Sequence, residues 1–89
     1  MLDIHEPIEV SAVFTKGRLK PISFVWKRRY YKIDSITGVY KYFVGASKCY
    51  GYIVRSGSDL YEISLNTGEM VWQLEKIHDG FDFYSQRKV

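Results

Sequence analysis

Seven residues in the first half of the chain have the types and spacing to bind phosphate groups. Two lie in an early loop, and five follow in one run that contains a tyrosine: Arg18, Lys20, Lys27, Arg28, Arg29, Tyr30 and Lys32. Lysine and arginine form charge-assisted hydrogen bonds with phosphate oxygens, and an exposed tyrosine ring can stack on a base. The pattern therefore predicts contact with DNA or RNA that weakens as the salt concentration rises.

The distribution of charge supports this prediction more than the net charge of +3 does. Residues 10–48 contain nine cations and one acid, Asp34, whereas residues 49–89 contain four cations and six acids. Charge asymmetry of this kind favours an anionic partner. The alternative is an ordinary solvated surface on which lysine and arginine protect strand edges.

Sequence motifs of common enzyme classes are absent. The chain has no glycine-rich phosphate loop, no Gly-x-Ser-x-Gly turn, and neither an HExxH nor a CxxC pattern. The two histidines, His5 and His78, lie near opposite ends of the sequence beside acids, as surface histidines often do. Cys49 is the single cysteine, so there is no internal disulfide and no set of zinc ligands. We therefore expect a protein without catalytic activity, cofactor or metal.

The length and composition predict one domain over residues 1–89, with its core in residues 8–78 and a tail, 79–89, that frays. Apolar residues make up 46% of the chain and aromatic residues 17%, which excludes disorder along the whole chain. No apolar run approaches the ~18 residues of a membrane span. The N-terminus lacks a basic leader followed by an apolar stretch. We expect a cytoplasmic protein that does not bind membranes.

Alternation of apolar and polar residues predicts the strands that position the seven candidates. The expected strands cover residues 8–15, 22–26, 30–36, 39–44, 49–55, 60–65 and 70–77, with turn residues between them. No stretch keeps the period of a helix, so no helix is expected to cover the sheet. The prediction is an all-β fold, a six- to seven-stranded antiparallel meander that curls into a small barrel or coiled sheet.

The segment FVWKRRYYKI, residues 24–33, predicts a hairpin with a basic turn. Its alternate apolar residues are expected in the core, and Tyr30 is expected to point outward beside the cations. Two-residue hairpin turns favour Asn-Gly, because both residues need a positive φ angle, so this turn predicts a longer loop, a bulge or local strain. In a meander, successive turns lie at opposite ends of the sheet. The cations of 16–20 and 27–29 therefore share one patch only if the sheet curls strongly.

Two motifs resemble a family of small bacterial all-β proteins of unknown function. The first is Phe-x-Trp-x-x-Arg-x-Tyr-x-Ile, and the second ends in Trp-x-Leu-x-x-Ile; they are carried by Phe24, Trp26, Arg29, Tyr31 and Ile33, and by Leu60, Tyr61, Glu62, Trp72, Leu74 and Ile77. Members tend to have glycine at the position of Arg28, and tryptophan at that of Tyr40 or Tyr42. Some members accompany DNA-repair polymerases. The resemblance, over residues 8–78, implies the fold and an association with nucleic acid, but no activity.

Together these patterns predict a non-catalytic binding module that contacts nucleic-acid phosphates through its basic N-terminal half. The alternative is a protein–protein interaction module that uses a tyrosine-rich sheet face or a free strand edge. Eight tyrosines in 89 residues keep this alternative open, since tyrosine suits both a half-buried sheet face and a recognition surface.

Overall fold

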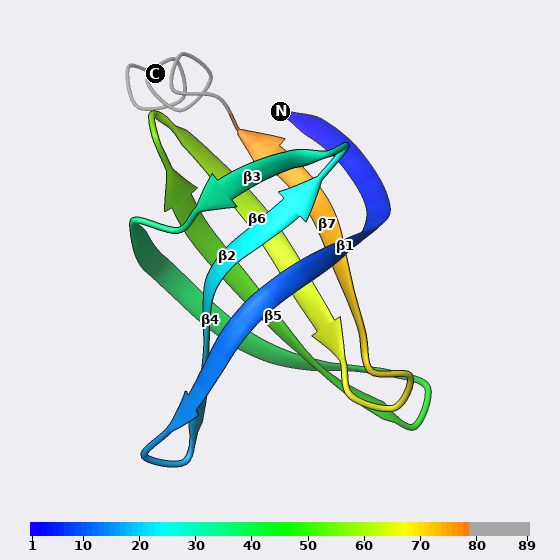
Figure 1. Cartoon of the computed structure of the whole chain (residues 1–89). Helices are drawn as coiled ribbons and strands as arrows, with labels where there is room; N and C mark the ends of the chain where they lie inside the picture. Colours follow the sequence, from blue (N-terminus) through cyan, green and yellow to red (C-terminus); the bar gives the residue numbers. More distant parts are fainter. Residues whose placement is uncertain (79–89) are drawn as a thin grey trace, which may run out of the picture.

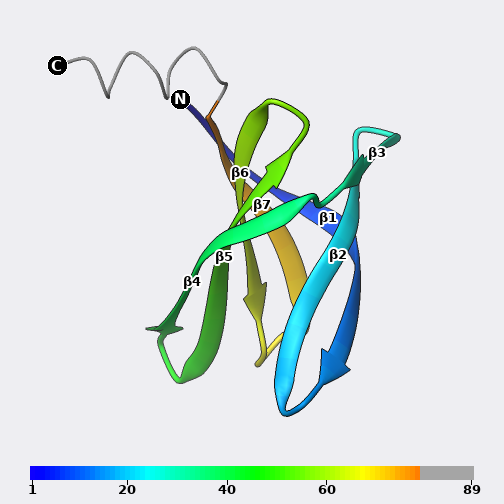
Figure 2. The ribbon, with the colours of Figure 1, turned by 90° about the vertical axis from the view of Figure 1, so that its left-hand side faces the viewer.

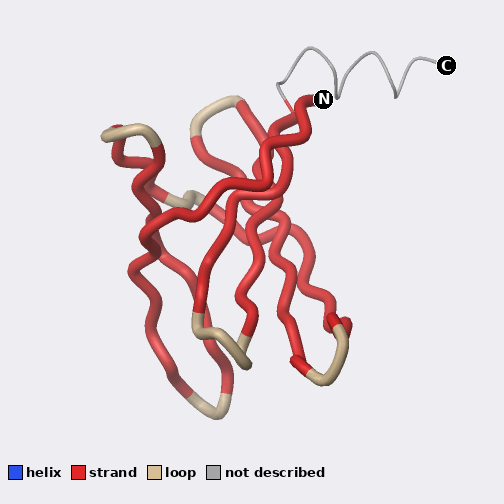
Figure 3. Tube along the Cα trace, turned by 90° about the vertical axis from the view of Figure 1, so that its right-hand side faces the viewer, coloured by secondary structure: helices blue, strands red, loops and turns tan. Residues whose placement is uncertain are grey.

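The computed structural model describes residues 1–78, which form seven strands joined by short turns (Figures 1 and 3). The strands are β1 (Leu2–Thr15), β2 (Arg18–Trp26), β3 (Arg29–Lys32), β4 (Ser35–Val44), β5 (Ser47–Ser56), β6 (Asp59–Asn66) and β7 (Val71–His78). These residues contain no helix, and hence none that is long and apolar enough to cross a membrane. The predicted tail, 79–89, lies outside the described residues.

The predicted all-β fold is confirmed, with seven antiparallel strands in one curled sheet. The strand order is β3-β2-β1-β7-β6-β5-β4. Consecutive strands are neighbours throughout, except that β3 does not pair with β4. Instead, β1 pairs with β7, so the first and last strands join and the open seam of the half-barrel lies between β3 and β4.

The two strands at the seam are the halves of one bent segment. The N–H of Ile33 donates to the carbonyl of Ile22 on β2 at 3.0 Å, and the next N–H, from Asp34, donates to the carbonyl of Arg55 on β5 at 2.8 Å. The chain therefore changes its partner strand within two residues. The Asp34 carboxylate also accepts a hydrogen bond from the N–H of Gly57 at 2.8 Å, which ties the crossover to the β5–β6 turn. From the crossover, β2 and β4 diverge toward the opposite end of the barrel (Figure 2).

The core lies inside the curled sheet. Its buried members come from β2, β5, β6 and β7, and are Phe24, Tyr52, Val54, Tyr61, Ile63 and Leu74. Burial of a large apolar side chain contributes about 1.5–3 kcal/mol, so these six dominate the stability of so small a domain. Both tryptophans and Tyr31 pack against this cluster, as predicted. Ile4 does so as well, and the core therefore begins before residue 8.

The predicted strand over residues 30–36 is wrong, because the crossover at Ile33 and Asp34 divides it between β3 and β4. Three other predicted boundaries are also wrong, and local backbone irregularities explain them. β1 begins at Leu2, although residues 8–15 alone were predicted as a strand. The register shifts between Asp3 and Glu6, where His5 has a φ angle of 56°, and this irregularity lets Leu2 and Asp3 still pair with β7. β2 begins at Arg18 and includes Pro21 of the predicted loop, which a strand with one free edge tolerates. The predicted break at 37–38 is a shift of register inside β4.

Candidate nucleic-acid interface

The β2–β3 turn consists of two residues, Lys27 and Arg28, between the paired residues Trp26 and Arg29. Lys27 has a φ angle of 51° and Arg28 one of 65°. Two positive φ angles are the signature of a type I′ turn, whose twist matches that of the flanking strands. A side chain in the left-handed region costs roughly 1–2 kcal/mol relative to the right-handed region. Of the three predicted alternatives, local strain is therefore the one that the structure contains.

Contacts around Trp26 hold this turn in place. The indole Nε1–H donates to Glu6 Oε1 at 3.0 Å, and the ammonium of Lys27 lies 4.9 Å from the centre of the same ring. Further down the hairpin, the rings of Phe24 and Tyr31 stack with centres 4.8 Å apart and planes 8° from parallel. These contacts oppose the strain of the turn, so the cations keep a defined position at the tip.

The seven predicted residues lie in two separate places. Arg18 and Lys20 are at the start of β2, whereas the residues from Lys27 to Lys32 belong to the turn and β3 at its other end (Figure 1). β2 has nine residues, which corresponds to a length of roughly 30 Å at about 3.3 Å per residue. The structure thus brings five of the seven together and separates the other two from them.

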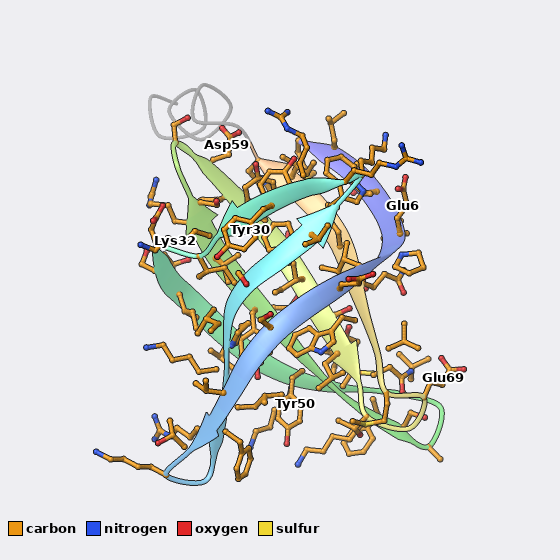
Figure 4. The ribbon with its side chains drawn as sticks, in the orientation of Figure 1. Glu6, Tyr30, Lys32, Tyr50, Asp59 and Glu69 are labelled. Atoms are coloured by element: carbon orange, nitrogen blue, oxygen red, sulfur yellow. The ribbon has the colours of Figure 1, made fainter. Side chains whose placement is uncertain are left out.

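Within the five, Tyr30 and Lys32 share the outer face of β3. Tyr30 is 68% exposed and pairs with Val25, and both residues extend from β3 in Figure 4. Arg29 lies on the opposite side, because it pairs with the inward-facing Trp26. The hairpin thus presents cations along its tip and β3, beside an aromatic ring that is free to stack.

The position of Arg29 influences the ionisation of Tyr61. Burial, followed by the charge of Asp59, raises the pKa of Tyr61 to about 12, and Arg29 acts against this shift. A guanidinium so placed can attract a phenolate only if the ring ionises, which requires strongly alkaline solution. At neutral pH Tyr61 is therefore a neutral phenol beside Arg29.

A surface hollow of about 380 Å³ adjoins the turn. It is lined by Pro7, Ile8 and Glu9 of β1 and by residues 25–28 of β2 and the turn. Glu9 is exposed and pairs with Val25, so it extends the outer row that contains Tyr30. A carboxylate in this row repels phosphate, which limits a favourable surface to the tip and the β3 side of the hairpin.

Two histidine–glutamate pairs lie on the sheet away from this hairpin. His5 Nδ1 is 2.6 Å from Glu75 Oε1, and the buried Ser64 donates its hydroxyl to Glu75 Oε2 at 2.6 Å. These distances resemble those of a catalytic relay, but the carboxylate holds both partners, so no base is placed to activate the serine. No group of three potential metal ligands occurs among residues 1–78.

The second pair joins three strands. His78 Nε2 is 3.1 Å from Glu62 Oε2, and the hydroxyl of Tyr40 donates to Glu62 Oε1 at 3.5 Å. Burial and then the charge of Glu62 raise the pKa of Tyr40. Glu62 thus links β7 and β4 through its two carboxylate oxygens.

Cys49 is buried and far from both histidines. Its thiol donates to the carbonyl of Ser47 at 3.8 Å, and it pairs with Asn66 near one end of the sheet. His78 pairs with Leu60 near the other end. Within residues 1–78, Cys49 and His78 therefore lie near opposite ends of the sheet and form no common site.

Sequence reasoning missed two other cations that gain significance from the fold. Lys41 and Lys48 were counted in the basic segment but given no site. Lys41 pairs with Tyr50, and the ammonium of Lys48 lies 5.4 Å from the centre of the Tyr50 ring. The sequence did carry a signal for them. Each lysine lies two residues from an apolar or aromatic residue of its own strand, and this period of two places both lysines on the inner face.

Comparison of the chain with protein-family models, curated proteins and solved structures gives no match. The resemblance to a bacterial family therefore stays a prediction, as do the association with polymerases and the cytoplasmic location.

Proposed function

We propose that this protein is a non-catalytic binding module that contacts nucleic-acid phosphates through its β2–β3 hairpin. The observation that carries the proposal is the strained turn of Lys27 and Arg28, followed by Lys32 on the same face as the exposed ring of Tyr30 and by Arg29 on the opposite face of β3. Segment 24–33 contains no acid. Four cations beside one stacking ring are the components with which proteins hold single strands without reading their sequence.

The geometry favours unpaired nucleotides over a duplex. Tyr30 stands on a short edge strand, and its ring can stack only on a base that has left a double helix. Glu9 lies two strands away in the same outer row, so the footprint is narrow. We therefore expect contact with a few nucleotides and little dependence on their sequence.

The test is fluorescence anisotropy with labelled single- and double-stranded oligonucleotides at about 50 mM salt. We expect the single strand to bind more tightly, and its affinity to fall as salt is raised. Replacement of Tyr30 by alanine should weaken binding of the single strand roughly 5- to 150-fold, because base stacking contributes ~1–3 kcal/mol. The Tyr30→Phe variant keeps the ring and should retain most of the affinity.

A matched pair of double variants tests the position of the site. Arg29→Ala with Lys32→Ala removes two cations from the hairpin, and Arg18→Ala with Lys20→Ala removes two from the other end of β2. The first should reduce the slope of log affinity against log salt by about 1.4–1.8, at 0.7–0.9 per phosphate contact, and the second much less. Equal effects, or no binding to any oligonucleotide at low salt, would contradict the proposal.

A further inference from the structure

The inner face of the half-barrel is filled near the crossover and on β6, where Leu65 is buried up to the β6–β7 turn, but it is bare near the β1–β2 and β4–β5 turns. Ile63 and Leu74, in the filled part, have no exposed surface. Phe14 is 74% exposed, Val39 58% and Phe43 66%. These three large apolar residues belong to the inner face, yet described residues leave most of their surface to water.

Strand pairing places these residues on the inner face. Val39 pairs with the buried Tyr52, and Phe43 pairs with Lys48, which lies over the ring of Tyr50. Residues directly opposite each other on neighbouring strands have their side chains on the same face. On β1, Ile8 and Val10 pack against the core, and Phe14 lies on the same face because it is four residues beyond Val10. Figure 4 shows Tyr50 in this lower half of the barrel.

Two unpaired strand edges border the bare part. β4 is the last strand of the sheet, so its outer edge has no partner strand over Ser35–Val44 among residues 1–78. β3 pairs with β2 only from Ser23 onward, which leaves the opposite edge of residues 18–21 without a strand. Figure 2 shows that these edges diverge from the crossover. We call the region between them, with Phe14, Val39 and Phe43, the open wall.

A side-chain contact fixes the two sides of the open wall relative to each other. The hydroxyl of Tyr52, on β5, donates to the carbonyl of Leu19, on β2, at 2.9 Å. This bond crosses the inside of the barrel at the point where the core ends. It ties β5 to β2 and leaves the outer edge of β4 uncovered among residues 1–78, so a ligand reaches that edge without separating packed strands.

The charge around the open wall is positive. Lys41 and Lys48 lie on the inner face of β4 and β5, whereas Arg18 and Lys20 pair with Thr15 and Val13 and lie on the outer face of β2. The three turns at this end, residues 13–20, 41–48 and 66–71, contain one acid, Glu69. A ligand of this region therefore gains from negative charge beside its apolar groups.

We propose that the open wall receives an extended, acidic segment of a partner protein, which adds to the sheet as a strand beside β4. Its backbone pairs with the free N–H and C=O groups of β4. Its inner-face side chains are apolar where they cover Phe14, Val39 and Phe43, and acidic beside Lys41 and Lys48, which lie on the same face. The edge of β2 is the weaker template, because it is short and Pro21 lacks an N–H.

This proposal is independent of the hairpin function, since the two surfaces lie at opposite ends of β2. A nucleic acid satisfies the cations but not the backbone groups of an edge strand. A second copy of this chain satisfies the backbone groups, but its own β4 brings Lys41 toward the same positive region. An acidic peptide meets both requirements.

The experiment uses a synthetic alternating valine–glutamate peptide, in which every second residue is valine, glutamate and valine in turn and the other residues are threonine, so that one face matches Val39, Lys41 and Phe43. It is roughly eight residues long, so that at about 3.3 Å per residue it matches most of β4. A peptide of the same composition, with the valines and glutamates in separate blocks, is the control. Hydrogen exchange of the full chain, followed by NMR, measures each amide of β4. We expect the alternating peptide to slow exchange of alternate β4 amides at least tenfold, and the block peptide to leave them unchanged.

Variants of β4 identify the face that the peptide uses. Phe43→Ala removes an inner-face ring, and Val44→Ala alters the next residue, which is 58% exposed on the outer face. The first should weaken peptide binding at least tenfold and the second less than twofold. The Lys41→Glu variant should reverse the preference, so that an alternating valine–lysine peptide binds more tightly than the valine–glutamate peptide.

Three results would overturn the proposal. The first is that neither alternating peptide changes exchange in β4. The second is slow exchange of β4 amides that depends on protein concentration without peptide, which would assign the edge to a second copy. The third is displacement of the peptide by an oligonucleotide whose own binding requires Phe43, which would assign the open wall to nucleic acid.

Discussion

The two ends of the barrel contain similar residues but differ in how completely the chain covers them. Near the crossover, the bent segment formed by β3 and β4 reaches both β2 and β5, and Phe24, Ile63 and Leu74 are buried. Near the β1–β2 and β4–β5 turns at the other end, the same segment has left β2, and residues of equal size such as Phe14 and Phe43 are exposed. The burial of an apolar side chain in this domain thus depends less on its residue type than on whether it lies near the crossover, where the chain passes from β2 to β5.

The same comparison separates two modes of recognition. The hairpin at the crossover end offers charge and one ring on a rigid support, which suits phosphates and an unpaired base. The open wall offers backbone groups, apolar surface and cations together, which suits an extended acidic peptide. Substitutions at each end therefore have different expected effects on stability, and four of them test the comparison.

The largest effect is expected in the filled part of the inner face. Leu74 has no exposed surface, so Leu74→Ala leaves a cavity and should lower the free energy of unfolding by about 2–5 kcal/mol. The matched control is Leu2→Ala, because Leu2 is 62% exposed and the same substitution there should change stability by less than about 0.5 kcal/mol. Urea unfolding followed by tryptophan fluorescence measures both. Equal losses would mean that burial differs less between these sites than the structure indicates.

The second effect is a gain of stability at the turn. Replacement of Lys27 and Arg28 by Asn-Gly relieves two strained φ angles and should raise the free energy of unfolding by about 1–2 kcal/mol. The control is Lys16→Asn in the β1–β2 turn, where Gly17 already occupies the second strained position, so the gain should be smaller. The Asn-Gly variant should also bind oligonucleotides less tightly. Stabilisation without loss of binding would show that Lys27 and Arg28 do not contact the oligonucleotide.

The third effect concerns the alkaline stability of the filled part. The folded-state pKa of Tyr61 is about 12, against an ordinary value of 10.0, so folding favours the neutral phenol. Its contribution is complete below pH 10 and is lost as the pH rises toward 12. The free energy of unfolding should therefore fall more steeply over this range in the wild-type protein than in Tyr61→Phe. Parallel curves for the two proteins would argue against the raised pKa.

The smallest effect is expected in the open wall. Phe43→Ala removes a ring that is 66% exposed, and should change the free energy of unfolding by no more than about 0.5 kcal/mol. The same variant is expected to impair peptide binding strongly, so stability and binding separate at this residue. A stability loss of several kcal/mol would instead show that the ring belongs to the core.

Individual residues show how far sequence reasoning reaches. Phe24 and Trp26 were predicted in the core from their alternation, and they are buried or pack against it, because their strand is covered by neighbours on both sides. Phe14, Val39 and Phe43 have the same alternation and are exposed. Alternation identifies the face of a strand on which a residue lies, but not whether another strand covers that face.

The candidate site was predictable to a similar extent. The run of cations and the outward direction of Tyr30 follow from residue types and the period of two. The division between Arg18 and Lys20 at one end and the hairpin at the other follows from the alternation of turns in a meander, and the structure contains it. The support of the turn by Glu6 was not predictable, because that contact joins residues 20 positions apart through pairing of β1 with β2.

The sequence by itself determined the all-β class, a count of six to seven strands, the residues that face inward, and the basic character of the first half. These follow from local alternation, turn residues and charge, which the chain carries wherever it folds. Only the tertiary structure decided that β1 joins β7, that the seam falls between β3 and β4, and that one end of the inner face stays open. Those features depend on which distant backbone groups pair at Ile33 and Asp34, and a pairing between distant strands leaves no periodic mark on the sequence.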